Sequence, residues 1–281
     1  MPNPEVVYDN IQVVRENEMR SDLWTDMDMS DDVYRNVHAK SAFWAGWYDL
    51  FQVGTIEAWD GYNTKSDPSV RHTSPITIDA CGHCLEAGPF FTENAIQGRT
   101  AVILGQLLDT FGIHPVARNE IKNVTFYVMS SNDDAGKTAG LYWTSVEAFP
   151  KPKMVDYYLH SDKSASTSVD QGSVPFTSYK SDPADPVPTM GGNNLPDSIG
   201  GSIPCGPMDQ AEIDERSDVL TFTTEVVSEE LALTGPLLAT LYVSSDAIDT
   251  DFMVKISDVY PTGEVRILQD RCQHTLTRPL S

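Results

Sequence analysis

Residues 42–51 read Ala-Phe-Trp-Ala-Gly-Trp-Tyr-Asp-Leu-Phe, and this stretch decides the fold. It is a short apolar run that is followed at once by an acid, Asp49. An apolar run of this length predicts a strand that is buried on both faces, as strands of parallel sheets are. An acid directly after such a strand indicates a functional loop, because ligands of open α/β sheets bind beyond the carboxyl ends of the strands.

A second run of the same kind follows at residues 75–80, Pro-Ile-Thr-Ile-Asp-Ala, and leads into Cys81-Gly82-His83. The carboxyl ends of parallel strands share one edge of a sheet, so we expect Asp49 and His83 to face the same cleft. A carboxylate beside an imidazole fixes the imidazole tautomer and stabilises the imidazolium that forms when the ring takes a proton from a serine. The order of acid before histidine is that of α/β-hydrolases.

Each of these two residues has a simpler interpretation, which the spacing alone leaves open. Asp49 could cap the helix that follows the strand, a common duty of Asp. His83 could be a turn histidine with no proton to move.

The remainder of the chain has helical patterns first and strand-like patterns after them. Residues 52–59 fit one or two helical turns, residues 62–74 a polar loop, and residues 100–111 have the apolar spacing of a helix. Beyond these, β-rich runs separated by turn residues occupy residues 124–129, 155–159, 219–223, 237–244 and 252–260. We therefore expect an α/β portion over residues 1–120 and an all-β portion, a sandwich or jelly roll, over residues 121–281. The Pro-, Gly- and Asn-rich residues 182–206 predict a long ordered loop.

The overall charge restricts the partners. The net charge is −22 and the pI is near 4.4, which excludes nucleic acid and anionic membrane as expected partners, since both are bound by clustered Lys and Arg. The acidity indicates a soluble surface, or attraction of cationic substrates. No apolar run approaches the ~18 to 20 residues of a membrane span, and residues 1–5 show no signal peptide, which leaves the localisation open.

Cys81-Gly82-His83-Cys84 has the spacing of a redox or zinc half-site. A zinc site needs a second close pair, and the remaining cysteines, Cys205 and Cys272, stand far apart in the sequence. A thioredoxin-like pair opens a helix, whereas this one follows a predicted strand. We therefore predict no metal site and no cofactor, and assign the importance of the motif to its histidine.

These motifs resemble those of the cocaine-esterase / X-prolyl dipeptidyl aminopeptidase hydrolases. The segment 46–51, Gly-Trp-Tyr-Asp-Leu-Phe, is similar to the acid-bearing segment of that family, and residues 76–83 are similar to the strand and turn that carry its histidine. Further stretches that match in family order are residues 124–132, 157–161, 182–192, 206–210, 215–220, 233–236 and 243–252. The resemblance extends over roughly residues 31–270, most of the chain.

The resemblance implies the C-terminal part of an α/β-hydrolase domain followed by a jelly-roll β-sandwich domain. It makes Asp49 the triad acid and His83 the triad histidine, although the family usually has Gly-Pro-Trp where this chain has Asp79-Ala80-Cys81. The family nucleophile lies in a Gly-x-Ser-x-x-Gly elbow, and no serine of this chain has that context. We expect the chain to be truncated at both ends relative to the family, as a fragment or as one of two subunits.

The expected function is therefore a serine hydrolase that acts by Ser-His-Asp acyl transfer to water, with the nucleophile outside this chain. The family acts on esters, amides and short X-Pro peptides, and the neutral residues 50–53 after Asp49 favour an uncharged acyl group. The triad needs no cofactor. The alternative is a non-catalytic β-sandwich binding or assembly module, or an inactive fragment, that pairs with a partner chain. The partners expected of the hydrolase are a small ester, amide or short-peptide substrate, and either a second chain that supplies the nucleophile or another copy in a homo-oligomer.

Overall fold

The computed structural model describes residues 12–14, 16–17, 22–83, 93–112, 121–130, 140–169, 176–195 and 204–276. The helices are α2 (Asp22–Met27), α3 (Asp31–Arg35), α4 (Gln52–Lys65), α5 (Glu93–Thr110) and α6 (Ala211–Asp214). The strands are β1 (Phe43–Tyr48), β2 (Ile76–Gly82), β3 (Val124–Val128), β4 (Tyr142–Val146), β5 (Tyr158–Leu159), β6 (Ala165–Ser166), β7 (Asp249–Val259) and β8 (Val265–Leu276). None of the described helices has the length and apolar character that crossing a membrane requires.

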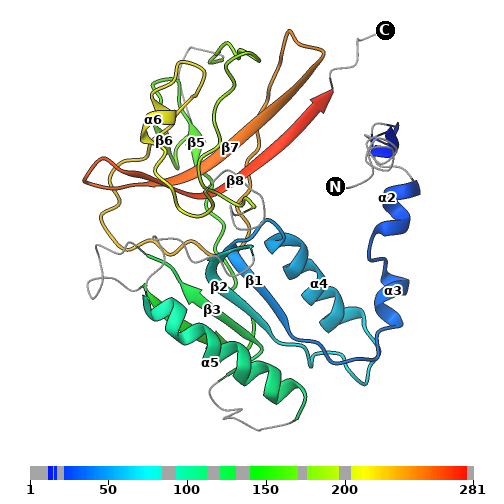
Figure 1. The fold of residues 1–281 in the computed structure, drawn as a ribbon. Coiled ribbons are helices and arrows are strands. Elements are labelled where there is room, and N and C mark those ends of the chain that lie inside the picture. Colours follow the sequence, from blue (N-terminus) through cyan, green and yellow to red (C-terminus); the bar gives the residue numbers. More distant parts are fainter. Residues whose placement is uncertain are drawn as a thin grey trace, which may run out of the picture.

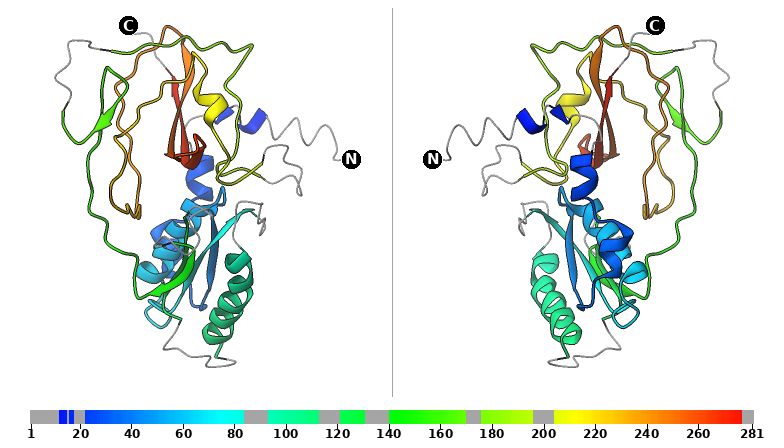
Figure 2. Two further views of the ribbon diagram at one scale, coloured as in Figure 1. Left: turned by 90° about the vertical axis from the view of Figure 1, so that its left-hand side faces the viewer. Right: turned by 90° about the vertical axis from the view of Figure 1, so that its right-hand side faces the viewer.

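The two strands predicted from residues 42–51 and 75–80 are confirmed as β1 and β2, which pair in parallel. They belong to a four-stranded sheet with the order β1-β2-β3-β4, in which β3 is parallel to β2 and β4 is antiparallel to β3. Every residue of β2 is buried, because α4 and α5 cover opposite faces of the sheet (Figures 1 and 2). The polar residues of this strand, Thr77 and Asp79, are buried together with the apolar ones because Gln106 and Arg99 of α5 contact them.

Helix α4 is longer than the one or two turns expected, because it runs through residue 65 into the stretch predicted as a polar loop. The extra turns are tied to the segment before β2. The amide of Asn63 donates to the Ser74 carbonyl (2.9 Å) and accepts from the Ser74 N–H (3.3 Å), and the Trp59 indole donates to the same carbonyl (2.8 Å). Side chains that satisfy buried backbone groups in this way lie beyond the reach of a periodicity argument.

The sheet crosses the boundary that we expected near residue 120. Val124 pairs with Ile76 and Phe126 with Ile78, so the run predicted to open the all-β portion lies in the α/β sheet. Gln106 of α5 reinforces this register, because its side-chain amide contacts the hydroxyls of Thr77 on β2 and Thr125 on β3. A buried polar group must find partners, and here one helical side chain serves two adjacent strands.

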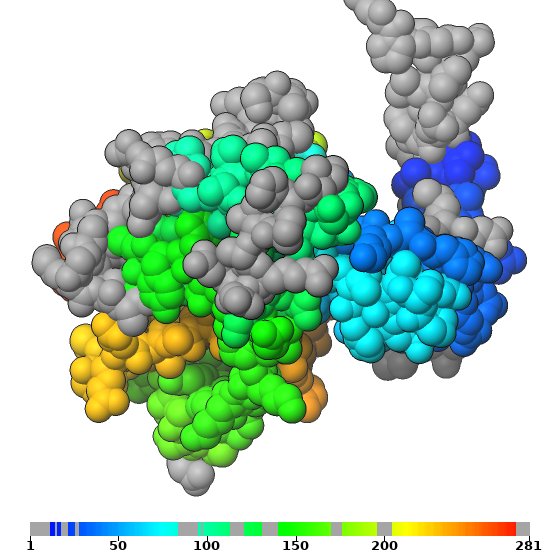
Figure 3. All heavy atoms as spheres, turned by 90° about the horizontal axis from the view of Figure 1, so that it is seen from below, coloured from blue at the N-terminus to red at the C-terminus, as the bar shows by residue number. Residues whose placement is uncertain are grey.

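The all-β portion forms fewer strands within the described residues than the sequence predicts. The long hairpin β7–β8 and the short pair β5–β6 are present, but residues 219–223 contribute only a bridge from Thr223 to Ser164, and residues 237–244 carry no strand. Residues 226–243 instead lie on the surface in Figure 3, with Tyr242 fully exposed and Leu238 77% exposed. A strand is stabilised only when its backbone pairs with a neighbouring strand, and residues 237–244 pair with none of the described strands.

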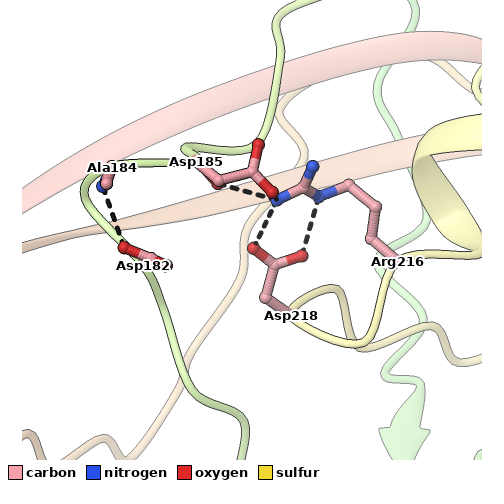
Figure 4. A network of polar contacts seen from close by, with 5 residues as sticks. All are labelled: Asp182, Ala184, Asp185, Arg216 and Asp218. Atoms are coloured by element: carbon pink, nitrogen blue, oxygen red, sulfur yellow. Dashed lines mark hydrogen bonds and ion pairs between the residues drawn. The ribbon is translucent and has the colours of Figure 1, made fainter.

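The predicted loop at residues 182–206 is confirmed as irregular over its described residues and is held by one arginine (Figure 4). Arg216 binds both carboxylate oxygens of Asp218 (2.8 and 2.9 Å), and it also donates to the Asp185 carbonyl (2.8 Å). This pairing holds the pKa of Asp218 below its usual value. Asp182 supports the same turn by accepting from the Ala184 N–H (2.9 Å).

A buried ion pair joins β2 to α5. Asp79 is fully buried and contacts the guanidinium of Arg99, which is about nine-tenths buried. Burial raises the pKa of Asp79, and the positive charge of Arg99 opposes that rise. Each charge is therefore kept in the interior by the other.

We predict that Arg99→Met lowers the free energy of unfolding by about 3 to 5 kcal/mol at neutral pH, because it leaves the Asp79 carboxylate buried and unpaired. Without Arg99 the pKa of Asp79 in the folded protein rises further above its value in the unfolded chain. The loss of unfolding free energy should therefore shrink as the pH falls, because the carboxyl becomes protonated and can be buried without a charge. Urea unfolding at several pH values measures both effects. Arg35→Met, which removes an exposed ion pair with Asp32, is the control and should cause little change. Equal losses in the two variants would contradict the prediction.

Candidate active site

Asp49 lies directly after β1, and its carboxylate is largely buried, with 15% of the side chain exposed. Oδ1 accepts the Phe51 N–H (2.8 Å), and the backbone carbonyl accepts the Gln52 N–H (3.0 Å). The residue does not cap α4 with its side chain, because the N-cap position is Phe51 and no side-chain bond caps that helix. Asp49 is therefore not the N-cap residue of α4, although it accepts backbone N–H groups just before and at the start of that helix.

His83 follows β2 and contacts Asp49. Its Nδ1 lies 3.1 Å from Asp49 Oδ1, and 24% of its side chain is exposed. The register of the sheet explains the contact, because Tyr48 pairs with Gly82 and the next residues of the two parallel strands are Asp49 and His83. The two predicted site residues are thus brought together at the carboxyl edge of the sheet.

This geometry suits a general base. An Nδ1–H that donates to the carboxylate leaves the lone pair on Nε2, where it can accept a proton from a hydroxyl. The partly exposed ring allows access, and the more buried carboxylate is held by a backbone N–H. The arrangement has the base and the group that orients it, which are two of the three parts of a nucleophilic triad.

An apolar rim borders the histidine. The ring of Phe51 packs edge-on against His83, with centroids 5.1 Å apart and an interplanar angle of 72°. Phe51 is nevertheless 55% exposed, and its neighbours Leu50 and Val53 are 36% and 50% exposed. From the sequence, residues 50–53 indicate only that no acid follows Asp49, and the contact of Phe51 with the histidine is visible in the structure alone.

The all-β portion contacts this edge at three points that the sequence analysis missed. The Tyr48 hydroxyl donates to the Ile267 carbonyl of β8 (2.9 Å), and the side-chain amide of Asn193 donates to the Asp49 carbonyl (3.0 Å). The third contact is Cys205, whose Sγ occupies the space where a side chain at Gly82 would begin. No local pattern marks these residues, because each contact joins segments more than 100 positions apart.

Cys81, the described cysteine of the motif next to His83, is a buried residue of the strand and not a reactive thiol. Cys81 is buried, and burial raises the pKa of its thiol, which keeps it protonated and unreactive. Cys84 lies outside the described residues. No disulfide joins Cys81, Cys205 and Cys272 to one another, and no group of three or more His, Cys, Asp or Glu side chains in the described part of the chain could hold a metal ion.

Comparison with known proteins identifies the family. Residues 119–278, more than half of the chain, match the model of the X-Pro dipeptidyl-peptidase C-terminal non-catalytic domain. The chain belongs to this family. The cocaine esterase of Rhodococcus sp. (strain MB1 Bresler) is 37% identical over 264 residues, covering 84% of this chain and 42% of the esterase. The resemblance to the cocaine-esterase / X-prolyl peptidase group is thereby confirmed.

A solved structure shows the same fold. The selenomethionine-labelled α-amino acid ester hydrolase aligns with a TM-score of 0.68 and 20% identity, over 94% of this chain and 45% of that hydrolase. The match confirms the predicted fold class, an α/β portion of a hydrolase followed by an all-β portion. This member of the X-Pro dipeptidyl-peptidase C-terminal domain family spans less than half the length of either relative.

We predict that Gly82→Ala destabilises the protein by about 1 to 3 kcal/mol, because the added methyl group collides with Cys205 Sγ in a packed interior. Cys205→Ala in the same chain should restore part of that loss by removing the sulfur. Denaturant unfolding of both single variants and the double variant gives the coupling energy. Additive losses would show that the two residues do not meet.

Proposed function

We propose that this chain supplies the acid and the histidine of a serine hydrolase that cleaves an ester or amide by acyl transfer to water. The observation that carries the proposal is the 3.1 Å contact between His83 Nδ1 and Asp49 Oδ1 at the carboxyl edge of the parallel sheet. The relationship to a cocaine esterase supports the reaction class.

The two residues would act as follows. Asp49 holds the imidazole so that Nε2 accepts the proton of a serine hydroxyl while the serine oxygen attacks the substrate carbonyl. The resulting imidazolium, stabilised by Asp49, donates that proton to the departing alcohol or amine. Water then attacks the acyl-serine, giving its proton to His83 Nε2, and the ring returns the proton to the serine as the acid is released.

The serine would come from outside this sequence, which has no Gly-x-Ser-x-x-Gly elbow. Such a segment could pair with β1, because β1 is the terminal strand of the sheet among the described residues and has β2 on one side only. A parallel strand added along β1 would end at the same edge as Asp49 and His83. A nucleophile at the end of that strand would then face the histidine.

The surroundings of His83 favour a neutral acyl group. Phe51, Leu50 and Val53 are partly exposed and apolar, and no acid occurs among residues 50–53 to bind a substrate ammonium. An aromatic or alkyl ester suits this rim better than an X-Pro peptide with a free N-terminus.

A non-catalytic assembly module is the second candidate, favoured by the exposed apolar residues of the segment 226–243. Exposed apolar stretches of this kind mark surfaces that bind another polypeptide. The partner would be a second chain or another copy of this one. This candidate requires association but no hydrolysis, which separates it from the first.

A chimera tests the catalytic proposal. When this chain replaces the region of the Rhodococcus cocaine esterase that it aligns with, we expect hydrolysis of an aryl ester that a serine-directed inhibitor abolishes. Asp49→Asn in that chimera should lower kcat by about 10³- to 10⁴-fold, because it removes the carboxylate that selects the imidazole tautomer. The 281-residue chain alone should be inactive. A folded chimera in which Asp49→Asn has no effect would overturn the proposal and favour the assembly module.

The apolar rim gives a separate prediction for specificity. In the same chimera, Phe51→Ala should lower kcat/KM for a neutral aryl ester by about 10-fold, the usual loss when an apolar pocket contact is removed. Phe111→Ala is the matched control, because Phe111 is similarly exposed (60%) and lies just after α5. Steady-state kinetics should show no change for the control. An equal effect of both substitutions would argue against a substrate contact at Phe51.

A further inference from the structure

We propose that Asn193, within the domain described as non-catalytic, is a positioning residue for the acid Asp49. This inference rests on the proposed function, and it assigns to the all-β portion a part in building the site. Asn193 lies in the matched region 119–278, 144 positions after Asp49. Its side chain contacts the backbone of the acid and leaves the carboxylate to His83.

The contact restricts the orientation of Asp49. The Asn193 amide donates to the Asp49 carbonyl (3.0 Å), which also accepts the Gln52 N–H (3.0 Å). Two donors on one carbonyl oxygen fix the plane of the following peptide, and with it the direction in which the Asp49 side chain leaves the backbone. A general base and its orienting group require such fixed geometry, since small misplacements cost large factors in rate.

The other end of the Asn193 amide shows that packing alone does not explain the residue. Its Oδ1 is buried and has no hydrogen-bond partner among the described residues. An unsatisfied buried oxygen is unfavourable, so an apolar side chain of the same size would fill this space better. What Asn193 contributes is its donor, and that donor is directed at Asp49.

The loop that carries Asn193 is held in a defined conformation. Gly191 and Gly192 have φ of +71° and +75°, values that favour glycine, and a side chain at Gly192 would begin 2.8 Å from the Asp270 carboxylate. Gly192 also exchanges two backbone hydrogen bonds with Gly206 (2.9 and 3.1 Å). The backbone preceding Asn193 therefore has little freedom.

A buried glutamine extends this support to the β7–β8 hairpin. Gln210 is fully buried, and its amide donates to the Met190 carbonyl (2.7 Å), three residues before Asn193. Its Oε1 accepts from Lys255 of β7 (2.8 Å), and its N–H donates to the Val265 carbonyl of β8 (2.7 Å). Hydrogen bonds thus tie the hairpin to the backbone at Met190, and the short stretch of chain from Met190 to Asn193 carries this support to the contact with the acid.

The tautomer of His83 tests the inference without any need for the nucleophile. In the 281-residue chain with ¹⁵N-labelled histidine, NMR at a pH where the ring is neutral distinguishes Nδ1–H from Nε2–H. We expect Nδ1–H in the parent chain and a shift to Nε2–H in Asp49→Asn, the reference variant. Asn193→Leu, nearly equal in size, should shift the population in the same direction while the chain stays folded.

Tyr48→Phe is the matched control, because it removes a hydrogen bond to β8 between the same two parts of the chain. It should lower thermal stability at least as much as Asn193→Leu and leave the tautomer unchanged. Suppose that Asp49→Asn shifts the tautomer. If Asn193→Leu then causes no shift, or a shift no larger than that of Tyr48→Phe, the positioning role is wrong and the proposed function stands. If Asp49→Asn causes no shift, the acid–histidine pair itself is wrong.

Discussion

The parallel pairing of β1 with β2 is the constraint on which the other features of this protein depend. It sets Tyr48 opposite Gly82, and Asp49 and His83 meet because they are the next residues of strands that run in the same direction. Apolar side chains from Ile76, Ile78 and Val124 bury the central strands beneath the helices. A shift of one residue in this register would separate the acid from the histidine and turn buried side chains outward.

The all-β portion is attached to the edge of the sheet that carries the site. Tyr48, the last residue of β1, donates to β8, and Gly82, the last residue of β2, lies against Cys205. The residues on the N-terminal side of both Asp49 and His83 are therefore in contact with it. The α/β portion thus carries the acid and the histidine, and the all-β portion contacts the residues around them. Although its family model is described as non-catalytic, the all-β portion lies within hydrogen-bond distance of the candidate acid.

The segment 226–243 keeps its apolar side chains on the surface. Residues 237–244 have the composition of a strand, but Leu238 and Tyr242 remain exposed and no described strand pairs with them. Each exposed large apolar side chain forgoes roughly 1.5 to 3 kcal/mol of burial energy, so covering this segment would contribute substantially to stability. Both candidate functions supply such a cover, one through the remainder of a hydrolase and the other through a partner.

The sequence by itself determined those secondary-structure elements that depend on neighbouring residues in the chain. The apolar run before Asp49 and the run before His83 predicted two buried strands, and the family motifs identified the fold class. It could not determine that residues 124–128 join the same sheet, or that residues 237–244 remain unpaired, because strand pairing depends on which edge is available in space. Only the tertiary structure decided that Asn193 and Cys205 reach the site, since these contacts join residues more than 100 positions apart and leave no periodic signal in the chain.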